Sequence, residues 1–447
     1  MTRQLTHRRQ QHHLTNTSVW SWDGNWIYYD IRSDANGSVF DGGRIERVHT
    51  RSGEVEVVYQ AQQDACVGVV TSSPVENKIA FIHGPEEPTA DWSYCAYHRH
   101  GVWMRPGQGT EVQHLDARDV VDPFTAGALR GGSHVHVFDD KGEWVSFTYE
   151  DHVLAMNPTG GQSNQRNVGV SIPGRRVTVP KTHCRNHDGE CFSVVVTQTH
   201  DNPEIGTDQI CKAYEDAWIG CDRRNQPVGK RQGRALAFIG DVMVADSLSS
   251  DSTHPDSSRK QTKSVPELFV VELPENCMVA GSEPLQGTVI SRPAPPAGTV
   301  QRRLTRTTDR AYPGLATDVR HWPRSKPDGS EIVFLMRDDN GVIQLWSISP
   351  NGGSPRQVSF GSESVGSALS VHPSGDLVAC VIGKSVCEVS LSDGRVEIVA
   401  EQNDRFVCLP FSVVYSPDGK EIAFGGAVKD NERAFNQIFV TESKRSK

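Results

Sequence analysis

The sequence predicts an all-β fold, a seven-bladed β-propeller with four-stranded blades, from one repeated phrase and its spacing. The phrase is an Asp-Gly or similar turn followed by a strand of alternating apolar residues. It occurs with its turn residue at positions 24, 77, 142, 189, 329, 375 and 419. Turn residues that accept a positive φ, placed before a period-2 strand, mark β-hairpins. Hairpins that recur roughly every 40–50 residues are typical of propeller blades.

Size and composition agree with one closed array. Because the repeat runs almost from end to end, we expect a single domain over residues 1–447. A hydrophobic content of 36% and 40 glycines suit many short strands joined by polar turns. No apolar run reaches the roughly 18 residues of a membrane span, so we expect no membrane partner. The net charge of −9 argues against a nucleic-acid partner.

Each copy predicts a pair of strands around its turn. In the third copy, Ser133–Phe138 turns and returns as Glu143–Tyr149. In the fourth copy, residues 183–185 enter a hairpin at Gly189 and residues 197–199 leave it. The last three copies are closely spaced and predict the three final blades.

The gap between the fourth and fifth copies, residues 189 to 329, is the longest between neighbouring copies. Its apolar pieces 234–239 and 265–271 predict outer strands of the fourth and fifth blades, with a hidden eighth blade as the alternative. Residues 208–220 have helical spacing. The Ser/Asp/Lys-rich residues 246–264 predict a disordered insertion, and residues 282–299 a Pro/Gly-rich loop.

The amino-terminal residues and the cysteines indicate in which cellular compartment we expect the protein. Residues 1–13 are basic and polar without the apolar core of a secretion signal, so we expect a cytoplasmic protein if Met1 is the true start. The ten cysteines form no Cys-x-x-Cys pair, which favours reduced, buried thiols over a disulfide framework or a zinc knuckle.

Histidine and arginine gather at the ends of the predicted hairpins. In a propeller the first strand of each blade lines the centre, so these ends converge on one mouth of a channel. Imidazoles exchange protons near neutral pH, and arginine grips a carboxylate through two parallel hydrogen bonds. A site of this kind suits β-elimination from a uronic acid. The sequence predicts His134 and His152 as the acid/base pair, Tyr149 in support, and Arg185 or Arg130 as the carboxylate clamp.

Further residues are candidates for substrate and metal. The predicted substrate-binding residues are His83, His183, Arg320, His321 and Trp322. The candidate metal ligands are His136, His183 and His187, for a divalent ion such as Zn, Mn or Ca. The alternatives stay open, because His134 and His136 alternate with valines as packing residues do, and tryptophans in propellers often pack between blades.

Particular phrases resemble known families. Residues 416–420 and 345–353 resemble the repeats of TolB-type propellers. Residues 81–86, 127–138 and 310–315, with others across both halves, resemble the bacterial YidR family, long catalogued as a domain of unknown function. The chain departs from that family in its Ser-rich insertion and extra cysteines. The architecture is also similar to the seven-bladed polysaccharide lyases, including oligogalacturonate lyase and the propeller ulvan lyases.

The lyase resemblance implies a site for acidic sugars with His, Tyr and Arg at the channel mouth, in some cases with a bound metal. We therefore expect a polysaccharide-lyase-like propeller that cleaves uronate-containing oligosaccharides of the ulvan or pectin type. The alternative is a non-catalytic, TolB-like propeller that binds a protein, a peptide or a sugar at the same mouth.

Overall fold

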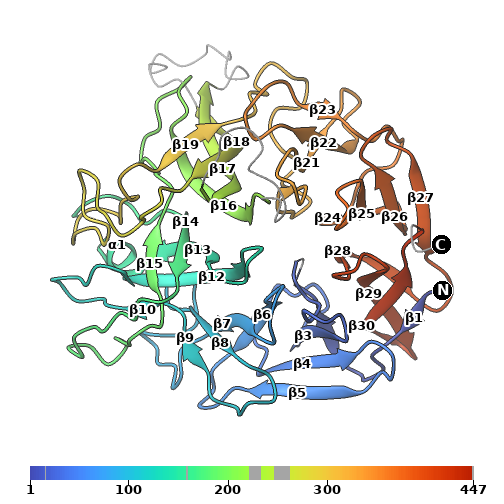
Figure 1. The fold of residues 1–447 in the computed structure, drawn as a ribbon, viewed down its shortest axis with the longest axis horizontal. Coiled ribbons are helices and arrows are strands. Elements are labelled where there is room, and N and C mark those ends of the chain that lie inside the picture. Colours follow the sequence, from blue (N-terminus) through green and yellow to red (C-terminus); the bar gives the residue numbers. More distant parts are fainter. Residues whose placement is uncertain (16, 158–159, 221–232, 246–261, 445–447) are drawn as a thin grey trace, which may run out of the picture.

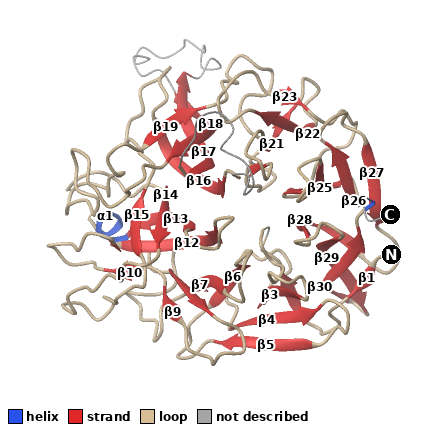
Figure 2. Cartoon of the chain, in the orientation of Figure 1, coloured by secondary structure: helices blue, strands red, loops and turns tan. Residues whose placement is uncertain are grey.

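The computed structural model describes residues 1–447 except 16, 158–159, 221–232, 246–261 and 445–447. In this part of the chain, seven four-stranded sheets are arranged around a common centre (Figure 1). Besides these sheets, the described residues form a short helix, α1 (His152–Met156), and a two-stranded ribbon of β10 (Ala117–Arg118) and β11 (Ala128–Leu129), and long loops join the strands (Figure 2). The predicted seven-bladed propeller is confirmed.

Each blade is a run of four antiparallel strands, counted outward from the centre. Blade 1 contains β2 (Gln11–His13), β3 (Trp26–Arg32), β4 (Arg44–His49) and β5 (Val55–Gln60). Blade 2 contains β6 (Val67–Ser72), β7 (Ile79–His83), β8 (His100–Met104) and β9 (Gln113–His114). Blade 3 contains β12 (Gly131–Phe138), β13 (Val145–Asp151), β14 (Asn167–Ile172) and β15 (Phe192–Val195).

The next three blades follow the same plan. Blade 4 contains β16 (Ile210–Trp218), β17 (Ala235–Ala245), β18 (Thr262–Glu272) and β19 (Val300–Arg303). Blade 5 contains β20 (Arg324–Ser325), β21 (Ile332–Arg337), β22 (Ile343–Ile348) and β23 (Arg356–Gln357). Blade 6 contains β24 (Ser370–Val371), β25 (Leu377–Ile382), β26 (Ser385–Ser390) and β27 (Val396–Glu401).

The last blade closes the ring with strands from both ends of the chain. It contains β28 (Val407–Tyr415), β29 (Glu421–Asp430), β30 (Arg433–Glu442) and, as its outer strand, β1 (Arg3–Gln4). Arg3 lies opposite Val440 and Gln4 opposite Phe439. The two termini therefore lie side by side, as Figure 1 shows. This pairing joins the first residues to the last and makes the propeller a closed ring.

The turns that join the two inner strands show why the repeated phrase works. Gly142, between β12 and β13, has a φ of 69°, where a side chain is strained. A Cβ there would lie 2.5 Å from the Val75 side chain. Asp139 Oδ1 accepts hydrogen bonds from the backbone N–H groups of Glu143 and Trp144, at 2.8 and 3.2 Å. The Asp and the Gly thus fix the turn, as the sequence predicts.

Apolar side chains fill the spaces between neighbouring blades. Val168 and Val170 of blade 3 share one buried cluster with Phe238 and Phe269 of blade 4, and each of the four is fully buried. Burial of such side chains stabilises a fold by roughly 1.5–3 kcal/mol each. The ring is therefore held together by blade-to-blade packing.

The fourth predicted hairpin is wrong, although the blade count is right. Gly189 lies in the connection between β14 and β15, where it pairs with Val177, and so belongs to the outer part of blade 3. Blade 4 lies entirely in the long gap. The pieces 234–239 and 265–271 fall in β17 and β18, which pair with each other in this one blade rather than in two. In the described residues the gap holds no further four-stranded sheet.

The predicted helix at 208–220 is also wrong, since Ile210–Trp218 is the strand β16. The register of β16 against β17 shifts twice, between Ile210 and Ala213 and between Tyr214 and Ala217. Each bulge adds a residue and reverses the alternation of side chains. Two bulges thereby place the apolar residues at helix-like intervals.

The structure describes most of the predicted loop 282–299 but little of the predicted insertion 246–264. Most of the predicted insertion 246–264 lies outside the described residues, and its last three residues begin β18. The loop 282–299 lies between β18 and β19, where isolated bridges pair Ala280 with Pro296 and Thr288 with Ser291. In the described part of the chain, no helix has the length and the apolar character needed to cross a membrane.

Candidate active site

The innermost strands of three consecutive blades bulge at matching places. Val69 of β6, Val135 of β12 and Glu215 of β16 have φ values of 56°, 55° and 51°, which non-glycine residues adopt only at a cost. The register of each strand shifts at the same point. Bulges redirect side chains. These three strands are the innermost of their blades (Figure 1), so the bulges set which of their side chains face the centre of the ring.

Part of this inner surface is apolar. Val135, Val137 and Trp322 form a buried cluster, against which Val69 and Trp218 pack. The Trp322 side chain is only 5% exposed. Trp322, predicted to bind substrate, therefore packs between blades and offers no open face on which a sugar could stack.

His134 of β12 lies beside the segment that precedes β8. The backbone N–H of Ser133 donates to the carbonyl oxygen of Arg99 at 3.2 Å. His134 is half-buried, and its Nδ1 is buried without a hydrogen-bond partner. Burial, and then the positive charges of Arg99, Arg320 and Arg166, lower the pKa of His134 well below its usual value. The lowered pKa keeps the ring neutral at neutral pH, with a lone pair that can accept a hydrogen bond, and makes it a weaker base than a free imidazole.

The three arginines near His134 differ in how far they are engaged. Arg166 pairs with Glu150 at 2.7 Å, and Arg320 pairs with Glu215 at 2.9 Å. Arg99 has weaker contacts than these two arginines, because its Nη1 is 3.5 Å from the Tyr94 hydroxyl and its Nε is buried without a partner. We call His134, Arg99, Arg166 and Arg320 the β12 cluster. Within it, Arg99 is the guanidinium with the weakest internal partners.

His152 lies away from this cluster. In the β12–β13 register His134 is opposite Thr148, whereas Gly131 is opposite Asp151. His152 is thus about four residues, or roughly 13 Å of strand, from His134 along the backbone. The structure does not bring this predicted acid/base pair together.

His152 contacts a different histidine. Its Nδ1 is 3.0 Å from Nε2 of His98, whose ring stacks on Trp92 with centroids 3.9 Å apart. Burial, followed by His98, lowers the pKa of His152 to about 4. The predicted His183 is near, with its ring 5.7 Å from that of Trp92. The structure thus joins His152 and His183 through Trp92 and His98, which the sequence reasoning missed.

The other predicted catalytic side chains are held by internal partners. The Tyr149 hydroxyl donates to Asp151 at 2.9 Å, and burial raises its pKa well above the usual value. Arg130 is fully buried and donates to Asp151 from Nη2 at 2.6 Å and from Nε at 3.0 Å, and to the carbonyl oxygens of Thr288 and Ser291. Arg185 donates to the carbonyl oxygens of Glu86 and Glu87 at 2.6 and 2.9 Å. These contacts favour structural roles.

Two predicted substrate-binding histidines are likewise engaged at both ring nitrogens. His83 is hydrogen bonded to the Tyr59 hydroxyl at 3.0 Å and to the Gly84 carbonyl at 2.7 Å. His321 is hydrogen bonded to the Val319 carbonyl at 2.9 Å, and its Nε2 accepts from the Leu335 N–H at 3.1 Å. Among the residues predicted to bind substrate, Arg320 is the one that the structure places in the β12 cluster.

The predicted metal ligands do not lie together. His136 is fully buried and hydrogen bonded through Nε2 to the Ser133 hydroxyl at 3.0 Å, and burial lowers its pKa to about 3. Only His187 falls in a group that could hold a metal, and its companions are His100 and His114, with one nitrogen of each ring within 4.8 Å of the others. No spacing in the sequence links His100 and His114, because they lie on different strands, β8 and β9, that the fold pairs side by side.

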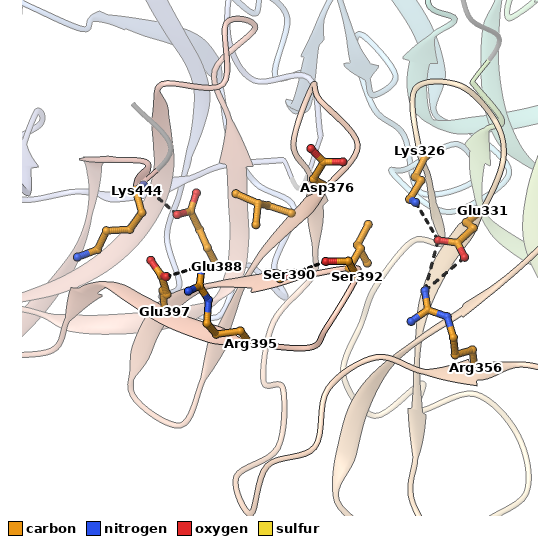
Figure 3. Close-up of a pocket in the computed structure, with 12 residues that line it drawn as sticks. Lys326, Glu331, Arg356, Asp376, Glu388, Ser390, Ser392, Arg395, Glu397 and Lys444 are labelled. Atoms are coloured by element: carbon orange, nitrogen blue, oxygen red, sulfur yellow. Dashed lines mark hydrogen bonds and ion pairs between the residues drawn. The ribbon is translucent and has the colours of Figure 1, made fainter. Parts of the chain in front are cut away.

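A hollow lies elsewhere, at blades 5 and 6 (Figure 3). It measures about 670 Å³, and ion pairs form on each of its two sides. Lys326 and Arg356 both contact Glu331, at 3.0 and 3.3 Å, and Arg395 contacts Glu397 at 3.0 Å. Because the charges neutralise one another, this hollow gives no sign of a specific charged ligand.

Comparisons with known proteins bear on the family and the fold. The sequence profile of a family described as "Protein of unknown function (DUF3748)" matches residues 66–187. The chain is 43% identical to the uncharacterized protein YidR of Escherichia coli (strain K12) over 448 aligned positions, which cover 99% of this chain and 97% of YidR.

Among solved structures, an oligogalacturonate lyase in complex with manganese has a TM-score of 0.58 at 10% identity and covers 100% of this chain and 93% of its own. An oligogalacturonate lyase from Vibrio parahaemolyticus has a TM-score of 0.51 at 8% identity, covering 100% and 94%. A puromycin-hydrolyzing peptidase of Mycobacterium tuberculosis has a TM-score of 0.52 at 13% identity, covering 96% of this chain and 53% of the peptidase. At these identities the likeness is one of fold.

Proposed function

We propose that this chain, which belongs to the YidR family, is a lyase-like propeller that cleaves uronate-containing oligosaccharides by β-elimination at the β12 cluster. One observation carries the proposal: His134 Nδ1 and Arg99 Nε are both buried without partners on neighbouring segments at the innermost strand of blade 3. Buried polar groups in proteins are normally paired, so two such groups on segments joined by the Ser133–Arg99 backbone hydrogen bond favour a polar ligand. The fold shared with oligogalacturonate lyase supports the choice of ligand.

Arg99 would bind the carboxylate of the uronic acid. A guanidinium binds a carboxylate through two parallel hydrogen bonds, and this pairing stabilises the negative charge that develops when the neighbouring C–H loses its proton. The Glu partners of Arg166 and Arg320 offset much of their charge, so these two arginines would mainly add a positive field. Arg99 replaces Arg185 and Arg130 as the proposed clamp.

His134 would move the proton. Its neutral ring accepts the proton from the carbon next to the carboxylate, the bond from the adjacent carbon to the glycosidic oxygen breaks, and a carbon–carbon double bond forms. The ring then gives the proton to the departing oxygen, which restores neutral His134. One imidazole can serve both steps when the proton and the leaving group lie on the same face of the sugar, so His152 is not needed.

The test is to incubate the purified protein with pectin-type and ulvan-type oligosaccharides, with and without divalent metal, while following the ultraviolet absorbance of unsaturated products. We expect product from at least one of these classes, and a loss of 10²-fold or more in H134A and R99A, the usual order for a general base. H200A, a substitution outside the cluster, is the matched control.

Silence of the wild-type protein across all acidic sugars under both metal conditions would refute the lyase proposal. Binding of an acidic oligosaccharide without product, lost in R99A, would instead support the non-catalytic alternative.

A further inference from the structure

We propose that His100, His114 and His187 bind one divalent transition-metal ion of the zinc class, and that this ion fastens the 173–191 connection of blade 3 to blade 2. The proposal is independent of the lyase activity, because the three histidines lie outside the β12 cluster. It replaces the predicted set His136, His183 and His187, of which it keeps one residue.

The backbone already holds the three residues in place. His100 begins β8 and His114 ends β9, which are neighbouring strands of blade 2. His187 pairs with Arg118 just beyond β9: the His187 N–H donates to the Arg118 carbonyl at 3.2 Å, and the Arg118 N–H donates back at 2.9 Å. Two blades thus contribute ligands from fixed positions, as a specific metal site requires.

The three rings lie close together, and those of His114 and His187 are stacked with an angle of 21° between their planes. The ring centroid of His100 lies 4.9 Å from that of His114 and 5.0 Å from that of His187. The centroids of His114 and His187 are 4.0 Å apart. Zinc–nitrogen bonds are about 2.0–2.1 Å long, so two ligands of one tetrahedral ion lie roughly 3.3 Å apart. Because the nitrogen atoms lie within 4.8 Å of one another, reaching that spacing takes a closure of up to about 1.5 Å, and the His114 or the His187 ring must turn out of the stack so that both lone pairs face the ion.

Each of the three rings has a buried nitrogen that lacks a hydrogen-bond partner. These atoms are His100 Nδ1, His114 Nδ1 and His187 Nε2, and His100 as a whole is only 6% exposed. Leaving such an atom unpaired costs about 1–3 kcal/mol, so three in one place call for a ligand. A metal ion satisfies three lone pairs at once, whereas one water molecule has only two hydrogens to donate.

A neighbouring contact orients one ligand. His187 Nδ1 lies 3.3 Å from the carbonyl oxygen of Asp188, which can only accept, so Nδ1 carries the proton. The lone pair of His187 is therefore on Nε2, the atom without a partner. A hydrogen bond of this kind from the far nitrogen is the usual support of a metal-binding histidine.

Ligand type selects the metal. Three neutral imidazoles suit Zn²⁺ or its neighbours Co²⁺ and Ni²⁺, while Ca²⁺ and Mg²⁺ prefer oxygen ligands. Arg118 brings a positive charge close by, but its guanidinium donates to the carbonyl oxygens of His98 and Arg99. Asp116, fully buried between His114 and Arg118 in the chain, supplies a compensating negative charge, and its Oδ2 has no partner.

The experiment uses the full-length protein, stripped with a chelator and then titrated with Zn²⁺ by calorimetry and with Co²⁺ by visible absorption. We expect one ion per chain, with a Co²⁺ spectrum of nitrogen ligands in low coordination number. H114A and H187A should each weaken binding at least 10²-fold, and H200A should bind as the wild type does. Limited proteolysis should cut the 173–191 connection faster in the stripped protein than in the zinc-loaded one.

The titration of the wild type decides the matter even if a variant does not fold. Absence of stoichiometric Zn²⁺ or Co²⁺ binding to a chain that circular dichroism shows to be folded would overturn the proposal. Binding that both substitutions leave unchanged would overturn it as well. Neither result depends on any lyase assay, so failure here and failure of the proposed function are distinguishable.

Discussion

Replacing Arg130 by alanine is expected to destabilise the protein strongly without removing a catalytic group. The side chain is 0% exposed, its partner Asp151 is 1% exposed, and their closest contact is 2.6 Å. Removing one partner of such a buried pair typically costs 3–5 kcal/mol, by the order of magnitude seen in other proteins, because it leaves an uncompensated buried charge. Arg130 also binds two carbonyl oxygens of the 282–299 loop, which adds to the loss.

Asp151 has further hydrogen bonds that hold it in the buried site when Arg130 is removed. The same carboxylate accepts the Tyr149 hydroxyl, and its Oδ1 accepts the Leu154 N–H at the start of α1, at 3.0 Å. With Arg130 gone, this carboxylate keeps its other contacts but loses its counter-charge. We therefore expect the free energy of unfolding to fall by about 3–5 kcal/mol.

Urea unfolding followed by fluorescence measures the change. The control is R306A, since Arg306 and Asp208 form an ion pair at 3.0 Å whose side chains are 61% and 45% exposed. Exposed pairs contribute about 0–1 kcal/mol, so this variant should unfold close to the wild type. If R130A were as stable as R306A and also lost oligosaccharide cleavage, Arg130 would be a substrate clamp and our structural assignment would be refuted.

Three further predictions concern the inner strands and turns. W322A should lower the free energy of unfolding by about 3–5 kcal/mol in urea, because it opens a cavity between blades; a loss below about 1 kcal/mol would contradict the packing role. G142A should destabilise more than G107A, since both glycines have a positive φ but only at Gly142 would a Cβ meet neighbours; equal melting temperatures would contradict this. Burial raises the pKa of Asp216 from 3.8 to about 7, so the native state binds its proton more tightly and stability falls as pH rises between these values. D216N should remove that fall in unfolding experiments from pH 4 to pH 8, and an unchanged pH profile would show that Asp216 is ionised in the native protein.

The class of fold could be predicted from the sequence because turn chemistry is local, but the count of seven blades was right because two errors cancelled: the copy at Gly189 belongs to blade 3, and blade 4 lies in the long gap. An Asp-Gly turn constrains only a few neighbouring residues, and an alternating strand needs only one buried face. The two wrong predictions fall where one of these signals was present without the other. At Gly189 the sequence has the turn residues but forms no hairpin between inner strands. In β16 the strand forms a hairpin with β17, but two bulges interrupt the alternation of its apolar residues.

Residue types at the site were predictable, but their partners were not. The sequence placed His134 on the innermost strand of blade 3, as observed, yet gave no means of choosing between His152 and Arg99 as its neighbour. Arg130 and Arg185 look alike in the sequence, but one is buried against Asp151 and the other is bound to two carbonyl oxygens.

The repeated turns therefore determined the class of fold and the positions of six of the seven blades. Only the tertiary structure decided which histidine and arginine side chains meet, because the contacts of Arg99 with β12 and of His187 with blade 2 join segments that are far apart in the chain. Hydrogen bonds and charges act over a few ångströms in space. No local pattern encodes which distant segment will occupy that space.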